Sequence, residues 1–208
     1  MEKTSTFTDT RDLLTYRIAR LRDGRWWFTE NFRHDSIEST IAAPDIGTTR
    51  TGTDPDYSPE KYGRLYSLKA AIASAPPGWH VPSIVEWETL VSKYGGKLST
   101  EIAYTLDQPH YEQISKALVD DGFSLMRGGI AISMDSSGRC VESKFLGSNC
   151  FATFLCATAP RGYVPWYLKP FMKREASFVW FVAFSQHQAF LNPENDNFWF
   201  SVRYIKDA

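Results

Sequence analysis

The residues best suited to catalysis or metal binding are few, and they lie far apart in this sequence. There are four histidines and three cysteines: His34, His80, His110 and His187, and Cys140, Cys150 and Cys156. Their spacings match no zinc signature, and the chain has no HExxH, GxSxG, phosphate-binding loop or GxGxxG sequence. We therefore predict no catalytic residue, no metal site and no cofactor.

One catalytic arrangement remains, a thiol paired with an imidazole. Cys150 with His80 or His187 would provide it, but nothing in the sequence brings these residues together. Buried free thiols are the favoured interpretation of the cysteines. His80 lies between apolar neighbours and is interpreted as a packed histidine that bonds to the backbone. An enzyme that uses Cys150 or Cys156 is thus the least favoured class of function.

Residues 192–197 form a dense cluster of amide and acidic side chains around one proline. Hard oxygen ligands of this kind bind calcium, but the spacing matches no EF-hand loop. Asn, Asp and Pro are also turn residues. We interpret the cluster as an exposed hairpin tip between two strands and leave calcium binding there open.

Residues 160–175 interleave aromatic, proline and basic side chains. Trp, Tyr and Arg are common interface residues, so the segment is a candidate docking element. It is equally compatible with an ordered loop that lies on its own domain. The candidate partner-binding residues are Tyr163, Trp166, Tyr167, Phe171 and Arg174.

The elements that must position these residues begin with strands. Alternating apolar and polar residues predict a strand over 14–21, a turn at Asp23-Gly24 and a returning strand over 25–28. Residues 35–60 lack periodicity and predict a long surface loop. Apolar runs predict further strands over 151–155, 178–184 and 198–205.

Helical spacing predicts three helices in the middle of the chain. The first runs from Arg64 to a stop at 76–78, the second begins at a capping box between Ser83 and Glu86, and the third covers 110–120. Their expected inward residues are, in order, Leu65, Leu68, Ala71, Ile72 and Ala75; Val85, Trp87, Leu90 and Val91; and Ile114, Leu118 and Val119. Strands, then helices, then strands indicate an α+β fold in a single domain over 1–208.

Composition excludes two classes of function. A net charge of −1 argues against a general nucleic-acid binder. No apolar run approaches the roughly 20 residues of a membrane-spanning helix, and the polar N-terminus has no signal core. We expect a cytoplasmic or phage-associated protein, or a secreted or surface one if the sequence is a piece of a longer chain.

Six segments together carry a resemblance to one family. They are residues 7–12, 26–31, 62–66, 77–83 with Glu86-Trp87, 122–124 with Gly128-Gly129, and 200–203. In this order they resemble the Fibrobacter succinogenes major paralogous domain family. The resemblance implies a C-type-lectin-like fold, with two or three helices packed on short, mostly antiparallel strands. Within it, residues 160–175 look like an insertion.

The resemblance also implies a cysteine before the Pro-Gly-Trp-His segment and another after Ser-Val-Arg, joined by a disulfide. Here those places hold Ala75 and Tyr204. Loss of both partners fits a protein that does not meet an oxidising compartment. The lectin-type calcium signatures are also absent, so calcium-independent binding is expected.

By this resemblance the chain is a non-catalytic module that binds a protein or glycan through loops near the last strands. The candidate ligand-binding residues are Gln186, His187, Gln188, Phe190, Asn192, Glu194, Asn195, Asp196, Asn197 and Trp199. A specific version is a bacterial or phage target-binding protein diversified by a retroelement. The alternative is a structural or assembly subunit of a phage particle or surface fibre that oligomerises through 160–175.

Overall fold

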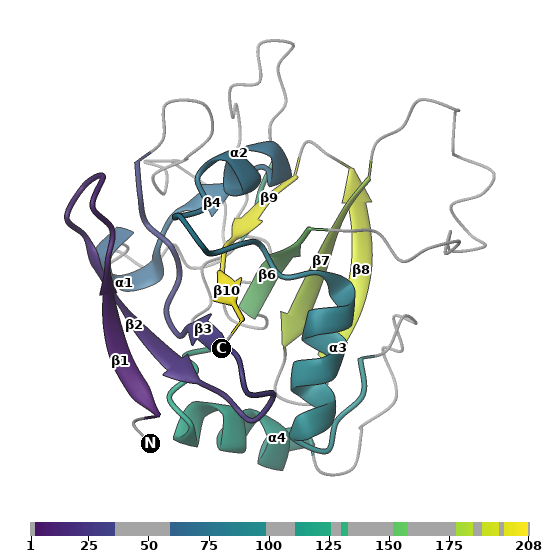
Figure 1. Cartoon of the computed structure of the whole chain (residues 1–208). Coiled ribbons are helices and arrows are strands. Elements are labelled where there is room, and N and C mark those ends of the chain that lie inside the picture. The colour runs from purple at the N-terminus through teal and green to yellow at the C-terminus, as the bar shows by residue number, and fades with distance from the viewer. Residues whose placement is uncertain are drawn as a thin grey trace.

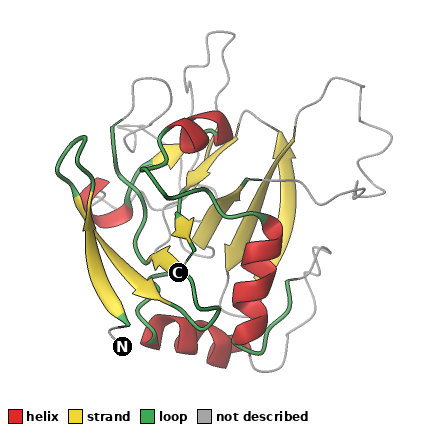
Figure 2. Ribbon diagram, in the orientation of Figure 1, coloured by secondary structure: helices red, strands yellow, loops and turns green. Residues whose placement is uncertain are grey.

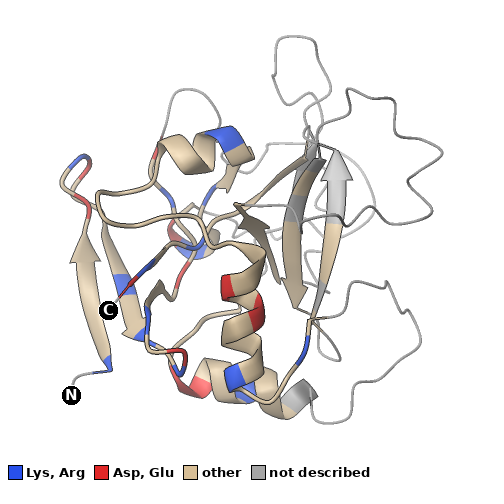
Figure 3. Cartoon of the chain, turned by 45° about the vertical axis from the view of Figure 1, so that its right-hand side comes forward, with Lys and Arg blue, Asp and Glu red and all other residues tan. Residues whose placement is uncertain are grey.

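The computed structural model confirms an α+β fold built from two mainly antiparallel sheets and the helices packed around them (Figures 1 and 2). It describes residues 3–35, 59–98, 111–125, 130–132, 152–157, 178–184, 189–195 and 198–207. Among these, no helix is both long and apolar enough to cross a membrane. Basic and acidic residues are interspersed over the described elements (Figure 3), in line with the small net charge.

The first sheet has the strand order β1-β2-β3-β10 and joins the two ends of the chain. Its strands are β1 (Thr4–Thr8), β2 (Thr15–Arg20), β3 (Trp26–Phe28) and β10 (Ile205–Lys206). The predicted turn between β2 and β3 is present, with Gly24 at a φ of 84° that favours glycine. Strand β1 was not predicted, because its sequence TSTFT has a single apolar residue and no alternation to detect.

The second sheet has the order β4-β9-β6-β7-β8, and β5 pairs with β9 beside this path. Its strands are β4 (Leu65–Tyr66), β5 (Ile130–Ile132), β6 (Ala152–Cys156), β7 (Phe178–Phe184), β8 (Ala189–Asn195) and β9 (Phe198–Ser201). The runs predicted as strands over 151–155 and 178–184 are confirmed. All five residues of β6 are buried, as expected of a central strand.

The prediction of one continuous strand over 198–205 is wrong, because two strands in different sheets share these residues. The chain leaves β9 at Ser201 and enters β10 only at Ile205, so that one apolar run serves both sheets. Between them, the carbonyls of Val202 and Tyr204 accept hydrogen bonds from Phe32 N and Phe28 N at 3.1 and 2.9 Å. An apolar run does not reveal where a strand changes sheet, because both sides of the break are buried.

Four helices are described: α1 (Pro59–Tyr62), α2 (Leu68–Ala73), α3 (Ile84–Lys93) and α4 (Tyr111–Asp120). The capping box of α3 is confirmed, with the Ser83 hydroxyl and the Glu86 carboxylate each bonded to the other's backbone amide. The first predicted helix begins too early, because Leu65 lies in β4 and Ser67 caps α2. Part of the predicted loop 35–60 lies outside the described residues.

Three residues expected to face inward are exposed instead. Ile72, Val85 and Val119 have exposed fractions of 54%, 67% and 51%. Each lies beside correctly predicted core residues on a short helix, where a shift of one position moves a side chain by about 100°. The remaining pattern holds, since Trp87, Leu90, Val91, Ile114 and Leu118 are buried.

Candidate functional site

The six segments that carry the family resemblance come together in space: four hydrogen-bond one another, and the rings of Phe7, Phe28 and Trp79 join the other two. We call them the motif framework: residues 7–12, 26–31, 62–66, 77–83 with Glu86-Trp87, 122–124 with Gly128-Gly129, and 200–203, of which Gly128-Gly129 lie outside the described residues. Asn31 Nδ2 donates to Tyr62 O at 2.7 Å and to Ser201 Oγ at 3.2 Å. Ser124 N donates to Thr29 O at 2.9 Å. Four of the segments therefore meet within a few hydrogen bonds, although they are far apart in sequence.

Arg203 lies at the centre of the motif framework and is completely buried. Its guanidinium donates to Phe28 O at 3.4 Å and to Ser124 O, and it lies 4.8 and 4.9 Å from the ring centroids of Phe123 and Phe154. Burial without a paired carboxylate lowers the pKa of Arg203 to about 9. Two carbonyls and two aromatic faces thus replace the usual ion pair of a buried arginine.

The first framework segment folds into a turn held by its own charges. Arg11 Nε donates to Asp9 Oδ1 at 2.9 Å, and Arg11 Nη2 donates to Ser74 O at 2.8 Å. The Arg11 hydrogen bonds lower the pKa of Asp9 despite its burial. This places the turn against the end of α2.

One group of potential metal ligands is present in the described part of the chain. Atoms of Asp9, Asp12 and His34 lie within 4.8 Å of one another. Each is already engaged: Asp9 by Arg11, and Asp12 by His34 Nδ1 and by Leu14 N. The positive charge of Arg11, which bonds Asp9, would also repel a cation at this position. The group therefore fits a hydrogen-bonded turn better than a metal site.

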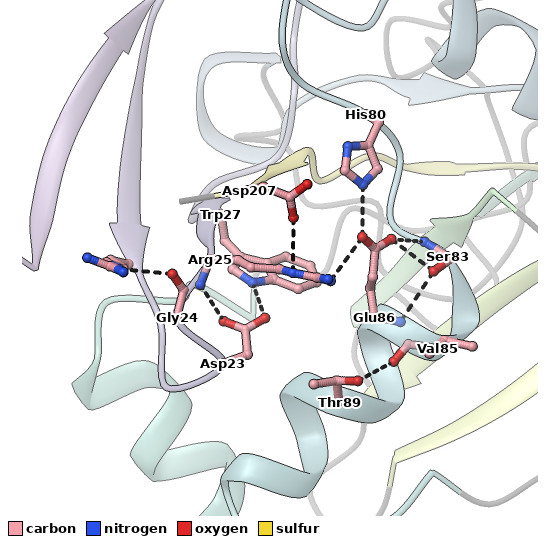
Figure 4. A network of polar contacts seen from close by, with 11 residues as sticks. Asp23, Gly24, Arg25, Trp27, His80, Ser83, Val85, Glu86, Thr89 and Asp207 are labelled. Carbon is pink, nitrogen blue, oxygen red and sulfur yellow. Dashed lines mark hydrogen bonds and ion pairs between the residues drawn. The ribbon is translucent and has the colours of Figure 1, made fainter.

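Most of the polar groups around the start of α3 bond the carboxylate of Glu86 (Figure 4). Its Oε1 bonds His80 Nε2 at 2.9 Å and Arg25 Nη1 at 3.0 Å, and its Oε2 accepts from Ser83 N at 2.7 Å and Ser83 Oγ at 2.9 Å. Arg25 Nε lies 3.3 Å from Asp207 Oδ1. The Glu86 carboxylate thus joins α3 to the β2–β3 turn, and Arg25 of that turn in addition contacts the C-terminal residue Asp207.

The pKa of Glu86 is lower than usual. Burial raises it, but the hydrogen bonds from Ser83 N, His80 and Ser83 Oγ together outweigh that effect. His80 and Ser83 both bond the carboxylate rather than each other, so the serine–histidine pair of a typical hydrolase is not formed at this cluster. The predicted packing of His80 is wrong for its side chain, which is 47% exposed, while its backbone forms a bridge with Ile205.

At the two positions where the family resemblance implies cysteines, Tyr204 is buried in the core and Ala75 is partly buried. Ala75 contacts the cluster of buried residues that contains Tyr204. The Tyr204 hydroxyl donates to Ala71 O at 2.6 Å, and both groups are buried. A hydrogen bond therefore joins α2 to the C-terminal segment, the two regions that the family resemblance would join by a disulfide.

Of the three cysteines, Cys156 lies in β6, is buried and is free. Burial raises the pKa of its thiol, which disfavours the reactive thiolate. Cys140 and Cys150 lie outside the described residues.

The predicted ligand-binding residues are distributed along the β7–β8 hairpin and the start of β9. Phe190, Asn192, Glu194 and Asn195 belong to β8, Asn192 is half-buried, and Trp199 in β9 is only 8% exposed. Gln186, His187, Gln188, Asp196 and Asn197 lie outside the described residues. The predicted hairpin tip over 192–197 is therefore wrong for its first four residues, which extend strand β8.

Strand pairing separates this set into two groups. Phe184 pairs with Ala189 at one end of the hairpin, and Phe178 pairs with Asn195 at the other. A seven-residue strand spans about 20 Å, so the segments 185–188 and 196–197 join opposite ends. Five of the ten predicted ligand-binding residues thus fall in two segments that depart from opposite ends of the hairpin, and the other five lie in β8 and β9.

The predicted partner-binding residues over 160–175 lie outside the described residues, but their point of attachment is defined. The chain leaves β6 after Cys156, which pairs with Trp180 near the start of β7. It re-enters at Phe178, which pairs with Asn195. The segment is thus attached at the end of the sheet from which residues 196–197 also depart.

Among the described residues there is also a shallow, open groove of about 500 Å³ on the first sheet. It is lined by Thr4, Ser5, Thr6, Arg17, Ile18, Ala19, Thr29 and Gly122. Its single cationic side chain, Arg17, already bonds Glu30 at 3.0 Å. Sequence reasoning missed this groove because β1, which forms one wall, was not predicted.

Comparison with protein-family models shows which family the chain belongs to. The model of the Fibrobacter succinogenes major domain matches residues 23–206, most of the chain. The chain belongs to this family. Searches of curated proteins and of solved structures found no match. The matched region contains five of the six framework segments, so family membership coincides with the residues that hold the fold together.

Proposed function

We propose that this member of the Fibrobacter succinogenes major domain family is a non-catalytic binding module with a C-type-lectin-like fold. It binds a protein or glycan through the loops at the ends of the β7–β8 hairpin. The observation that carries the proposal is a difference in how polar residues are used: segments of the family motifs hydrogen-bond one another inside the fold, whereas the polar segments 185–188 and 196–197 connect strand ends. Loops on a rigid scaffold are the usual place for recognition.

A screen of the whole chain against glycan and protein arrays tests this proposal. For any ligand found, two triple alanine variants divide the hairpin: one at Gln186, His187 and Gln188, and one at Asn195, Asp196 and Asn197. Because the two groups lie at opposite ends, a compact ligand is expected to lose affinity with one triple only. Binding that neither triple weakens would place the site elsewhere.

Diversification by a retroelement is the specific version of this proposal. It is supported by the family and by the polar and aromatic segment over 179–199. The test is at the DNA level, where a nearby reverse-transcriptase gene and a template copy of the terminal coding segment, differing at adenines, are expected. Their absence would reject this version and leave the general one.

The lack of catalysis is part of the same proposal. It is supported by the Glu86 cluster, in which histidine and serine do not meet, and by the buried thiol of Cys156. We expect Cys156 to resist an alkylating reagent in the folded protein and to react after unfolding. Rapid, stoichiometric labelling of a native cysteine with a low pKa would support the enzyme hypothesis instead.

A structural or assembly subunit is the second candidate. It is favoured by the attachment of residues 158–177 at the same sheet end as residues 196–197, which would present one combined surface. Light scattering after size exclusion, on the whole chain and on a deletion of 160–175, tests it. An oligomer that the deletion converts to a monomer is expected from this candidate.

A further inference from the structure

Strand β1 is the outermost strand of the first sheet and forms one flank of the molecule (Figure 1). Its pairing with β2 fixes the direction of its backbone groups. Lys3 O accepts from Arg20 N at 2.8 Å, and Asp9 N donates to Leu14 O at 2.9 Å. Odd-numbered residues therefore bond β2, and the amides and carbonyls of Thr4, Thr6 and Thr8 point away from it.

This outer edge lacks the usual protection against strand pairing. Edge strands are commonly guarded by proline, charged side chains or bulges. Strand β8, at an edge of the other sheet, contains Pro193 and Glu194. Strand β1 has neither a proline nor a charge, is paired without a bulge, and is exposed except for the partly buried Phe7. In the described part of the chain, only β2 pairs with it.

We propose that the outer edge of β1 pairs antiparallel with β1 of a second copy of this chain, with the two-fold axis at Thr6. In that register Thr6 faces Thr6 of the partner and Thr4 faces Thr8. These are the residues whose backbone groups point outward, so all three pairs exchange two hydrogen bonds each. The threonines share one face, where cross-strand pairs of this type are favourable.

The charges beside the strand favour this occupant and this direction. Pairing about Thr6 places Lys3 of each copy beside the turn of the other copy that carries Asp9, Arg11 and Asp12 and is net negative. Asp9 itself is buried and bonded to Arg11, so the attraction is to the turn as a whole and not to that one carboxylate. A parallel arrangement would instead place like charges side by side. The contact is small compared with a stable dimer interface, so the association is weak and depends on concentration.

Sedimentation equilibrium of the whole chain over a wide concentration range tests the proposal. Thr6→Pro removes only the outward amide, because Thr6 N does not bond β2, and is expected to weaken association by at least about tenfold. Thr6→Val keeps the amide and is the matched control, with association retained. Near-ultraviolet circular dichroism checks that both variants are folded.

A charge exchange identifies the partner as a second copy. Thr6→Lys alone and Thr6→Glu alone place like charges on the two-fold axis and are expected to be monomeric, while an equal mixture of the two associates. Pairing with a different peptide would not be rescued by mixing. A wild-type chain that is monomeric throughout, or a dimer that Thr6→Pro leaves unchanged, overturns the proposal. A deletion of 160–175 leaves this dimer intact, which separates it from the assembly candidate.

Discussion

The motif framework and the β7–β8 hairpin use their polar residues in opposite ways. In the framework, Asn31, Glu86 and Arg203 are buried or largely buried, and each bonds segments distant in sequence. In the hairpin, the backbone forms a regular ladder, and most of the polar residues belong to the sequence segments 185–188 and 192–197. The recognisable sequence motifs therefore belong to the residues that stabilise this domain, whereas the residues proposed to bind a ligand carry no motif.

The largest expected effect is at the centre of the framework. Arg203→Ala leaves a cavity and removes the donors to Phe28 O and Ser124 O, so we expect a loss of about 4 kcal/mol in the free energy of unfolding. Denaturant titration measures it. Lys206→Ala, which removes a partly exposed cation above Trp79, is the control and is expected to cost under about 0.5 kcal/mol. Equal losses would contradict the central role of Arg203.

Gly63 tests how closely the framework segments pack. It has a φ of 76°, and a Cβ there would lie 2.4 Å from Asn31 Cβ and 2.9 Å from Phe32 O. Gly63→Ala is expected to cost about 3 kcal/mol through strain and overpacking. Gly78→Ala has a similar φ of 80° but meets nothing within 4 Å, so it isolates the backbone strain at about 1 kcal/mol. Thermal unfolding of the two variants should therefore differ clearly.

Glu86 gives the framework a dependence on pH. Because its folded pKa is lowered, the unfolded state binds the proton more readily, and the stabilisation is present above the unfolded pKa and lost as pH falls. Glu86→Gln is expected to cost about 1–2 kcal/mol at pH 7, and its difference from wild type is expected to shrink as the pH falls through the folded pKa of Glu86. Unfolding free energies measured from pH 7 to pH 3 check this. A constant difference would show that the carboxylate charge is not responsible.

The smallest effect on stability is expected in the hairpin. The two alanine triples, at 186–188 and at 195–197, are each expected to change the free energy of unfolding by less than about 0.5 kcal/mol. At least one should nevertheless weaken ligand binding at least about tenfold, as loss of a few central contacts does. If a triple alanine variant unfolds the domain, the hairpin also stabilises the fold, and its proposed difference from the motif framework is wrong.

The fold was predictable where a local rule acts on the backbone. The Ser83–Glu86 capping box, the Gly24 turn and the buried runs of β6 and β7 each follow from neighbouring residues. The break between β9 and β10 and the extent of β8, whose last residues were predicted to form a hairpin tip, depend on distant partners and were mispredicted. Asn192 is the clearest case. Asparagine next to proline favours a turn, but pairing with Phe181 places this residue in a strand.

The site was less predictable than the fold for a related reason. The resemblance identified the framework residues but not their mutual contacts. The Arg25–Glu86 ion pair, for example, joins residues 61 positions apart, and no local pattern predicts it. The prediction for His80 was correct for its backbone and wrong for its side chain. A half-exposed histidine next to a carboxylate has no signature in a single sequence.

The passage of the chain from β9 to β10 has a consequence for how this protein is made. Arg203 bonds Phe28 across 175 positions, and β10 completes a sheet whose other strands are synthesised well before it. Contacts of such long range form late and slow folding. While the ribosome is still translating, β3 therefore lacks its outer neighbour, and the domain closes only after the segment that ends at Lys206 has emerged.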